Sequence, residues 1–392
     1  MSLYAVGIAL YILPFGLTVV SYLGYPLLLL VLRRRRMSVS TTDQSEWPLI
    51  TIVIPVFNEA QMIASTLNNL LEADYAPELR QILVVSDASF DTTDEIVGEF
   101  ADRGVELVRL DTRGGKTAAE NRAIIQFRGS IIINLDATTR IPPNSIRALV
   151  RAFHDPLVGV ASGCDVMIFD ESLKLNVEES RYVNYEMWIR RLETESGSIV
   201  GASGCFFAIR RELFDKISPE TLSRDFLSPL IAYEHGFRSI SVDSAICFVW
   251  RTRSVKVEFE RRIRTMAMGL QTLWYKRHLL NCRRHGWFAV LLIGHKLLRW
   301  VALLSIPLGV LGLLILGFES VGGSMFIAAN LFVVGIGAIG YLWPAGGRTP
   351  RLPALLGLLL SAHLAGLFAW HRALTGKIDP IWEPTRRPLG ER

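Results

Sequence analysis

The sequence predicts a chain of two parts: an α/β domain with a doubly wound, mostly parallel sheet, and a set of transmembrane α-helices. Three observations support this division. Half of the 392 residues are hydrophobic, which is a high share for a soluble domain. The longest apolar stretches lie near the two ends of the chain. Between them, short β-branched runs alternate with segments of helical spacing, and this alternation is typical of a parallel sheet.

The first apolar stretch, residues 3–32, contains no charged residue and exceeds the roughly 20 residues needed to cross a bilayer. Four arginines at residues 33–36 follow it directly. Positive charge at the end of a span favours the cytoplasmic side, although a solvated linker without an orienting role is an alternative. We therefore expect a transmembrane helix within residues 1–36, a linker at residues 37–47, and a cytoplasmic domain held at the inner or plasma membrane of the cell.

Three more apolar segments have the length of membrane spans, and they cover residues 297–318, 323–343 and 352–370. We expect three transmembrane helices within residues 297–374, amphipathic interfacial helices in residues 256–296, and a tail at residues 375–392. Four spans would place the C-terminus outside, whereas the arginines of the tail favour the inside. The side of the C-terminus therefore stays open.

The net charge of +5 does not indicate a nucleic-acid partner. Much of the positive excess lies beside apolar segments, where lipid headgroups are the expected partner. The four cysteines are dispersed without CxxC spacing, so the sequence suggests neither a zinc site nor a disulfide framework.

Residues 48–255 are expected to form the cytoplasmic domain. Its predicted strands cover residues 49–55, 82–85, 105–110 and 130–135, and its predicted helices cover residues 61–73, 92–103 and 117–127. In parallel sheets, ligands bind beyond the carboxyl ends of the strands. Polar residues follow three of these ends, namely Asn58, Glu59, Asp87 and Asp136. Acidic residues also open loops and cap helices, so only their joint occurrence points to a site.

Two motifs at these strand ends resemble those of family 2 glycosyltransferases. Residues 54–59, Ile-Pro-Val-Phe-Asn-Glu, resemble the opening strand motif, and residues 86–91, Ser-Asp-Ala-Ser-Phe-Asp, resemble the Asp-Asp-Gly-Ser-x-Asp loop. The resemblance covers residues 48–274 and is to the membrane type that includes chitin-oligosaccharide, hyaluronan and poly-N-acetylglucosamine synthases. It implies a GT-A-like nucleotide-sugar domain, with Asp87 on the uracil and Pro55, Asn58 and Glu59 near the nucleoside.

The segment from Gly114 through Lys116 to Asn121 is similar to the family's Gly-x-Lys-x-x-x-x-Asn segment, whose lysine faces the nucleotide. A P-loop is excluded, because the first glycine of that motif would have to stand at Leu110. A basic turn before a helix is the alternative for Lys116.

Asp136 and Thr138 stand where the family has Asp-x-Asp. The resemblance implies that the first position helps to hold the sugar nucleotide and that the second ligates a divalent metal. A leaving diphosphate develops charge that Mg²⁺ or Mn²⁺ neutralises, and these hard cations prefer carboxylate oxygens. We therefore expect Mg²⁺ or Mn²⁺ as the cofactor, with Asp136 and Thr138 at its site.

A glycine-rich stretch resembles the family's acceptor-lining segment, in which small residues allow a sugar to approach closely. It comprises Gly201, Ala202, Ser203, Gly204 and Cys205. Asp225 aligns with the aspartate of the family's Thr-Glu-Asp motif, which implies that it is the catalytic base. Without the resemblance, an N-cap for a helix over residues 226–235 would explain Asp225 equally well.

Arg261, Arg262 and Arg264 lie on an expected helix over residues 258–274 and are candidates to bind the diphosphate. Processive members of the family carry Gln-x-x-Arg-Trp on this helix, and the present sequence lacks that motif. Processive synthesis and single transfer therefore both stay open.

Together these features predict an inverting transfer of a hexose or N-acetylhexosamine from a UDP-sugar to a glycan or lipid-linked acceptor, in polysaccharide synthesis at the membrane. A single-transfer lipid glycosyltransferase is one alternative, and a catalytically silent scaffold of a polysaccharide export complex is another. The silent scaffold is disfavoured, because Asp87, Asp136 and Asp225 all occupy positions that the chemistry requires.

Overall fold

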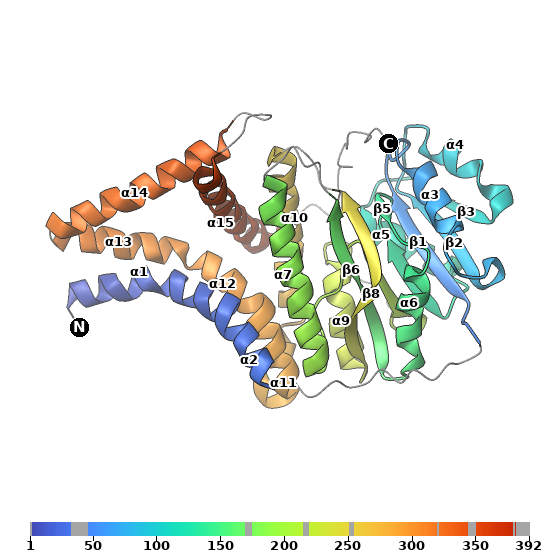
Figure 1. Ribbon diagram of the computed structural model, residues 1–392, viewed down its shortest axis with the longest axis horizontal. Helices are drawn as coiled ribbons and strands as arrows, with labels where there is room; N and C mark the ends of the chain where they lie inside the picture. The colour runs from blue at the N-terminus through green and yellow to red at the C-terminus, as the bar shows by residue number, and fades with distance from the viewer. Residues whose placement is uncertain are drawn as a thin grey trace.

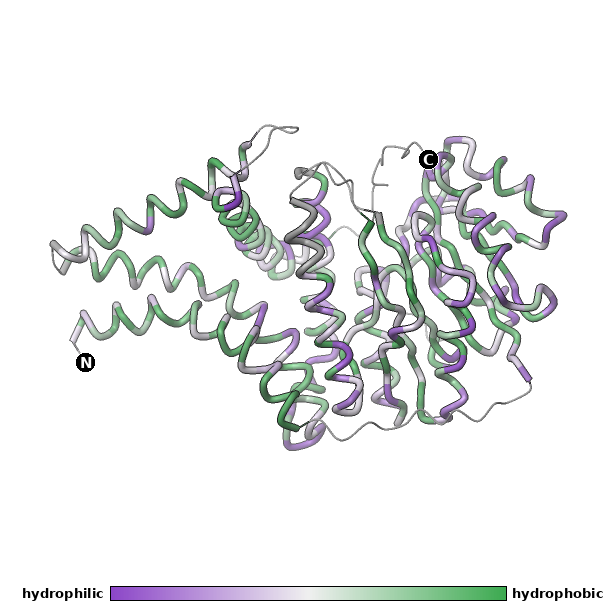
Figure 2. Tube along the Cα trace, in the orientation of Figure 1, coloured by the Kyte–Doolittle hydropathy of each residue, from purple (hydrophilic) through white to green (hydrophobic). Residues whose placement is uncertain are grey.

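The computed structural model describes residues 2–32, 46–168, 175–214, 219–250, 255–319, 321–343, 350–378 and 381. Figure 1 shows a layered α/β domain beside a group of long helices, of which α1, α13 and α14 extend away from it. These helices are hydrophobic along most of their length, whereas the domain alternates between hydrophobic and hydrophilic residues (Figure 2). The predicted division into two parts is confirmed.

An eight-stranded sheet forms the centre of the domain, in the order β3-β2-β1-β4-β7-β6-β8-β5. The strands are β1 (Ile50–Val56), β2 (Arg80–Ser86), β3 (Val105–Arg109), β4 (Ile131–Leu135), β5 (Thr139–Arg140), β6 (Val158–Ile168), β7 (Phe206–Arg210) and β8 (Arg238–Trp250). Strands β3, β2, β1 and β4 pair in parallel, while β7 is antiparallel to both β4 and β6. The doubly wound, mostly parallel sheet is therefore confirmed.

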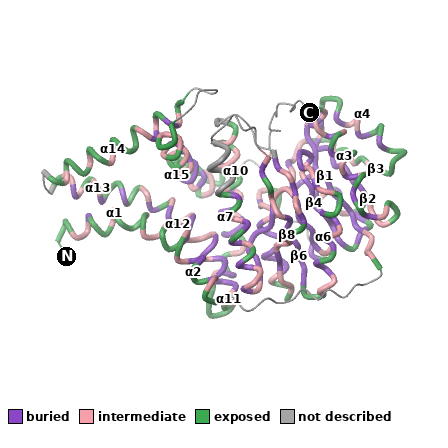
Figure 3. Tube along the Cα trace, in the orientation of Figure 1, coloured by how far each residue is buried: buried purple, intermediate pink, exposed green. Residues whose placement is uncertain are grey.

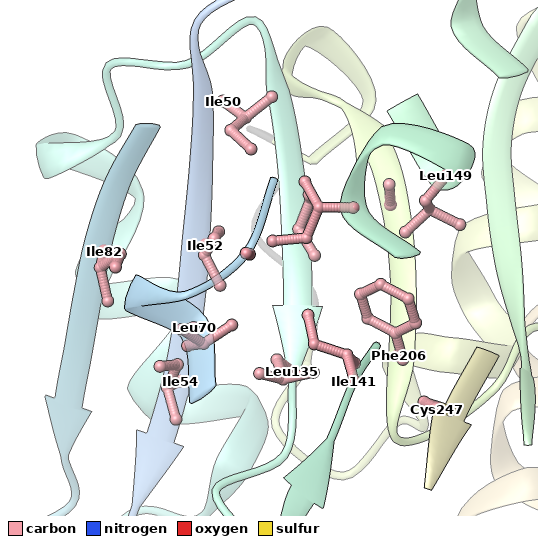
Figure 4. Close-up of a cluster of buried hydrophobic side chains, with 14 of the residues drawn as sticks. Ile50, Ile52, Ile54, Leu70, Ile82, Leu135, Ile141, Leu149, Phe206 and Cys247 are labelled. Carbon is pink, nitrogen blue, oxygen red and sulfur yellow. The ribbon is translucent and has the colours of Figure 1, made fainter. Parts of the chain in front are cut away.

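Helices cover both faces of the sheet, and β1 is buried along its whole length. On one face, Ile52 and Ile54 of β1 join a cluster with Leu70 and Phe206 (Figure 4). On the other face, Val53 belongs to a second cluster, because successive side chains of a strand point to opposite faces. Such burial on both faces explains why the parallel strands are continuous apolar runs.

The helices of the domain are α3 (Ile63–Leu71), α4 (Thr93–Gly98), α5 (Lys116–Ala123), α6 (Ser145–Arg151), α7 (Leu175–Ser196), α8 (Arg211–Phe214) and α9 (Arg224–Glu234). The three predicted helices are confirmed, but each is shorter than predicted at its carboxyl end. A 3-10 turn follows α4, and Gly104 closes it with φ 84°, a left-handed conformation that glycine adopts readily.

Outside the domain the chain is almost entirely helical. Its helices are α1 (Leu3–Val19), α2 (Tyr25–Leu32), α10 (Val255–Tyr275), α11 (Cys282–Leu292), α12 (Leu298–Leu304), α13 (Ile306–Glu319), α14 (Val321–Tyr341) and α15 (Arg351–Thr375). Two π-helical turns, η1 (Val20–Gly24) and η7 (Ile293–Leu297), join α1 to α2 and α11 to α12.

Four helices in the described part of the chain are long and apolar enough to cross a membrane: Leu3–Leu32, Cys282–Leu304, Gly322–Tyr341 and Arg351–Thr375. The second begins earlier than the predicted span at residues 297–318, because α11, which is kinked at Gly286, continues through η7 into α12, and α13 is a shorter separate helix. In the most apolar part of this helix, 44% of the residues are buried inside the protein, whereas the corresponding share for the N-terminal helix is 6%. The arginine run at residues 33–36, most of the linker and most of the tail lie outside the described residues.

The helices α2 and α11 pack directly against α7 and α9 of the domain, in an apolar cluster that includes Tyr25, Leu192, Phe226 and Leu291. Figure 3 shows that burial is concentrated in the domain and decreases along α1, α13 and α14. The contact between the two parts is therefore an extended protein core.

A chain of polar side chains crosses this core. The Tyr25 hydroxyl donates to Glu193 (2.5 Å), and the ring nitrogens of His295 lie 2.7 Å from Glu193 and 3.0 Å from Glu186. Arg299 forms an ion pair with Glu186. Burial alone would raise the pKa of the Glu186 carboxyl, but Arg299 and the hydrogen bond from His295 hold it well below its usual range. These bonds tie α2, α7 and η7 together.

The contact between α14 and α15 depends on glycines. A Cβ atom on Gly340 would lie 1.8 Å from the carbonyl oxygen of Pro353, and one on Gly357 would lie 2.6 Å from the backbone nitrogen of Tyr341. In membranes, small residues allow helices to approach closely, and packing then holds them together.

We expect Gly340→Leu to separate α14 from α15 and to lower the thermal unfolding temperature in detergent by several degrees. Gly335→Leu is a matched control on the same helix, because a Cβ atom there meets nothing within 4 Å. Equal unfolding temperatures for the two variants would contradict this account of the packing.

Candidate functional site

The loops that follow β1 and β2 are interlocked at the carboxyl edge of the sheet. The backbone N–H of Asn58 donates to Ser89 Oγ (3.1 Å), and Asn58 Oδ1 accepts from the N–H of Phe90 (3.0 Å). The N–H of Glu59 donates to Thr93 Oγ1 (2.8 Å). Asn58 also has φ 50°, a conformation that non-glycine residues rarely adopt. Asn58 and Glu59 therefore fix the shape of this edge through hydrogen bonds to the loop that follows β2 and to the start of α4.

Asp87 is fully buried and fixes the glycine turn that begins α5. Its two carboxylate oxygens accept from the backbone N–H groups of Gly114 (2.8 Å) and Gly115 (2.9 Å). Gly115 has φ 92° and occupies the N-cap position of α5. Because Lys116 is the first residue of that helix, Asp87 also fixes the position of the Lys116 backbone.

Lys116 and Asp136 form an ion pair of 2.5 Å, and both side chains are about one-third exposed. The ammonium also donates to the carbonyl oxygen of Gly204 (3.0 Å). Burial alone would lower the pKa of Lys116, but the Asp136 and Glu120 charges outweigh burial and raise it. Lys116 is therefore a permanent cation at the edge of the sheet, and not only part of a turn.

Asp225 lies in the first turn of α9, whose N-cap residue is Ser223. The alternative interpretation of Asp225 as an N-cap is therefore wrong. The Ser223 hydroxyl donates to Asp225 Oδ1 (2.5 Å), and a Cβ atom on Gly204 would lie 3.4 Å from Asp225 Oδ2. The carbonyl oxygen of Gly204 accepts a hydrogen bond from Lys116. Gly204 is therefore next to both the Asp225 carboxylate and the Lys116 ammonium.

The predicted acceptor segment is only partly open. The fully buried Ser203 donates to Asp165 Oδ1 (2.5 Å), and the carbonyl oxygen of Ala202 accepts from Arg190 (3.1 Å). Both residues therefore hold the segment in place. Gly201 and Gly204 are the positions whose missing side chains leave room, beside Lys296 and Asp225 respectively. Asp165 and Arg190 were not foreseen from the sequence.

A buried ion pair between Glu120 and Arg224 was also not foreseen. Arg224 Nε lies 2.7 Å from Glu120 Oε2, and their side chains are 6% and 0% exposed. Arg224 also donates to Asn121 and lies 4.3 Å from the centre of the Phe214 ring. Burial raises the pKa of Glu120, while the Arg224 charge opposes that rise. Because Arg224 directly precedes Asp225, the pair fixes α9 to the helix that carries Lys116.

Two of the three predicted arginines of α10, Arg261 and Arg262, pair with Glu258 on the same helix. Arg261 and Arg262 lie 2.6 Å and 3.1 Å from the same Glu258 oxygen, and Arg264 is half-buried. Residues Ile263 and Ala267 on another face of α10 pack with α15. Diphosphate binding by these three arginines stays a prediction.

The residues near Asp136 fit a metal ion only together with a substrate. The described residues contain no group of three or more His, Cys, Asp or Glu side chains that could hold a metal, and Thr138 is largely buried. Asp136 is a single carboxylate. Mg²⁺ is commonly bound by one or two carboxylates together with substrate phosphates, so a diphosphate would have to complete the ligand set.

Comparisons with known proteins identify the family of the domain. Residues 51–218 match the family model Glycosyl transferase family 2. An N-acetylglucosaminyltransferase from Rhizobium leguminosarum bv. viciae is 29% identical over 242 residues, which are 55% of each chain. A poly-beta-1,6-N-acetyl-D-glucosamine synthase from Staphylococcus aureus is 23% identical over 229 residues, 57% of this chain and 55% of that one. The chain thus spans about half the length of these curated relatives.

The fold is similar to that of a solved structure, a mannosyltransferase from Pyrobaculum calidifontis in complex with GDP-Man and Mn²⁺. The TM-score is 0.72 at 21% identity, over 96% of this chain and 100% of that one. The domain therefore has a GT-A-like fold, beside apolar helices long enough to cross a membrane. Residues 51–218 carry a glycosyl transferase family 2 domain, as the motifs of the sequence predicted.

Replacing one partner of the Glu120–Arg224 pair leaves a buried charge uncompensated, which costs about 3–5 kcal/mol. We expect Arg224→Met to lower the free energy of unfolding in detergent by that amount. Arg191→Met is the matched control, because Arg191 pairs with Asp243 at the surface, where the two side chains are 54% and 49% exposed, and such pairs contribute at most about 1 kcal/mol. A small effect of Arg224→Met, similar to that of the control, would contradict the structural role of the pair.

Proposed function

We propose that this protein is an inverting glycosyltransferase that moves a hexose or N-acetylhexosamine from a UDP-sugar to a glycan or lipid-linked acceptor at the cytoplasmic face of the membrane. The observation that carries the proposal is the arrangement around Gly204, which has Asp225 on one side and the Lys116–Asp136 pair on the other. The names of the two curated relatives, both N-acetylglucosamine enzymes, favour an N-acetylhexosamine as the transferred sugar.

Lys116 is suited to the donor side of the reaction. Its ammonium is anchored by Asp136 and by the Gly204 carbonyl, so it needs no rearrangement to meet developing negative charge. Preorganised charges of this kind stabilise a leaving diphosphate. A divalent metal held by Asp136 and the donor phosphates would neutralise part of the same charge.

Asp225 is suited to the acceptor side. In an inverting transfer, the carboxylate accepts the proton of an acceptor hydroxyl, whose oxygen bonds to the anomeric carbon while the bond to the diphosphate breaks on the opposite face. The hydrogen bond from Ser223 leaves Oδ2 of Asp225 directed toward Gly204. The small residue there leaves space for a sugar hydroxyl.

Single transfer to a membrane lipid is the second candidate outcome. It is favoured by α10, whose Arg261 and Arg262 pair with Glu258 on their own helix, in the place where processive relatives would hold a growing chain. Product length after synthesis in vitro separates the two outcomes. A ladder of polymers supports polysaccharide synthesis, and one discrete product supports single transfer.

We expect Asp225→Asn to lower the rate of UDP release about 10²- to 10⁴-fold, the range that general base catalysis contributes, without lowering the unfolding temperature. The measurement is UDP release by protein in nanodiscs with a panel of UDP-sugars and added membrane lipids. Asp102→Asn, at an exposed position, is the control and keeps the wild-type rate. Wild-type protein that releases no UDP with any donor would refute the proposed function and favour a silent scaffold.

We expect chelation with EDTA to suppress UDP release and Mn²⁺ or Mg²⁺ to restore it. Thr138→Asp would supply the second carboxylate that the family pattern has at this position, and hard cations prefer carboxylate oxygens. It is therefore expected to lower the metal concentration needed for half-maximal rate, and Asp136→Ala is expected to raise it at least tenfold. Rates that are the same with and without EDTA would show that Lys116 alone supplies the charge.

A further inference from the structure

Lys296 is a half-buried cation at the junction between the domain and the helices. In the same turn, His295 contacts Glu193 and Glu186, and Arg299 pairs with Glu186. Among the residues that the structure describes, no hydrogen bond or ion pair involves the Lys296 ammonium. The two nearby carboxylates are engaged by other side chains.

The side chain of Lys296 is directed toward the acceptor segment. Its Nζ and Cε atoms lie 3.3 Å from where a Cβ atom on Gly201 would be, and Nζ lies 5.5 Å from the centre of the Phe226 ring. Phe226 is the neighbour of Asp225 in the chain. Lysines near the end of a span often extend toward the interface, but this one contacts the domain that carries the site.

The backbone that carries Lys296 is held tightly. A Cβ atom on Gly294 would lie 2.2 Å from the Tyr25 ring, so α2 packs against η7 at close range. Tyr25 is itself held by Glu193. The ammonium is therefore kept in a half-buried position, where Glu186 and Glu193 attract it without forming an ion pair with it, and this burial opposes folding. A charge retained at such a cost in an apolar helix is a reason to look for a ligand.

The distance to Asp225 limits what that ligand can be. Lys296 lies beside Gly201 and Asp225 beside Gly204, and the Cα atoms of these two glycines, three residues apart, are at most about 11 Å from each other. An anionic group at Lys296 and a hydroxyl at Asp225 could thus belong to one molecule.

We propose that Lys296 binds the phosphate of a membrane lipid acceptor whose free hydroxyl reaches Asp225. This inference rests on the proposed function and narrows its acceptor to a lipid phosphate with a nearby hydroxyl. An ammonium binds phosphate as a point charge, and exposed apolar side chains of α2, namely Leu27 and Val31, give a lipid an apolar surface. A phosphoglycerolipid headgroup and a polyprenyl-diphosphate-linked sugar both have this chemistry.

The test compares wild type, Lys296→Gln and Lys296→Arg in nanodiscs. Three acceptors are supplied: phosphatidylglycerol, a polyprenyl-diphosphate-linked N-acetylglucosamine in phosphatidylcholine, and a neutral chito-oligosaccharide in phosphatidylcholine. Lys296→Gln is expected to raise KM at least tenfold for one of the phosphate-bearing lipids, with KM for the UDP-sugar unchanged, and Lys296→Arg is expected to restore most of the affinity. The lipid that responds identifies the source of the phosphate.

Two controls keep the outcome specific. Lys377→Gln removes an exposed lysine at the end of α15 and is expected to leave every KM unchanged. Because an unpaired charge is lost, Lys296→Gln is expected to unfold at or above the wild-type temperature. A KM for both lipids that stays at the wild-type value, or an equal loss of transfer to the neutral oligosaccharide, overturns the proposal.

If the proposed function is wrong, the result is different: wild-type protein releases no UDP with any donor. Binding of the two phosphate lipids, measured by native mass spectrometry, then decides the inference by itself. Weaker binding to Lys296→Gln than to wild type supports the lysine site, and equal binding refutes it.

Discussion

The ion pair between Glu120 and Arg224 lies where α5 and α9, the helices that carry Lys116 and Asp225, meet. The helix α5 begins with Lys116, and Arg224 immediately precedes Asp225 on α9. Burying two charges is expensive, and attraction between them offsets that cost only when further contacts are good. Asn121 and the Phe214 ring supply those contacts. This pair holds α5, which begins with Lys116, against α9, which carries Asp225, and in the proposed reaction a shift of about 1 Å between these two residues would lower the rate steeply.

Asp87 and Asn58 show the same use of polar side chains as internal supports. Both follow strands at the edge where ligands bind in parallel sheets, and both make bonds to the adjacent loop. Neither bond excludes contact with a nucleotide, since each carboxylate or amide oxygen accepts more than one hydrogen bond. The loops at this edge of the sheet are therefore fixed to one another by these hydrogen bonds.

The sequence allowed the four parallel strands and the polar residues at their ends to be predicted, because buried parallel strands have a simple apolar pattern. It did not reveal the pairing of Glu120 with Arg224 or of Ser203 with Asp165, since these partners are far apart in the chain and follow no local period. The second span was predicted too late in the chain for a related reason. Apolar composition cannot distinguish a helix that faces lipid from one that, like α11, packs against a domain.

Hydrogen bonds at the junction join Tyr25, Glu193 and His295. These three residues are far apart in the sequence, so they are synthesised at different times. All eight strands of the sheet lie within residues 50–250, so they are synthesised before η7. The carboxylate of Glu193 gains its imidazole partner only after η7 has emerged. Attachment of the domain to its membrane helices is therefore a late step of biogenesis, and a chain that stops before residue 295 would lack the bonds that hold the two parts together.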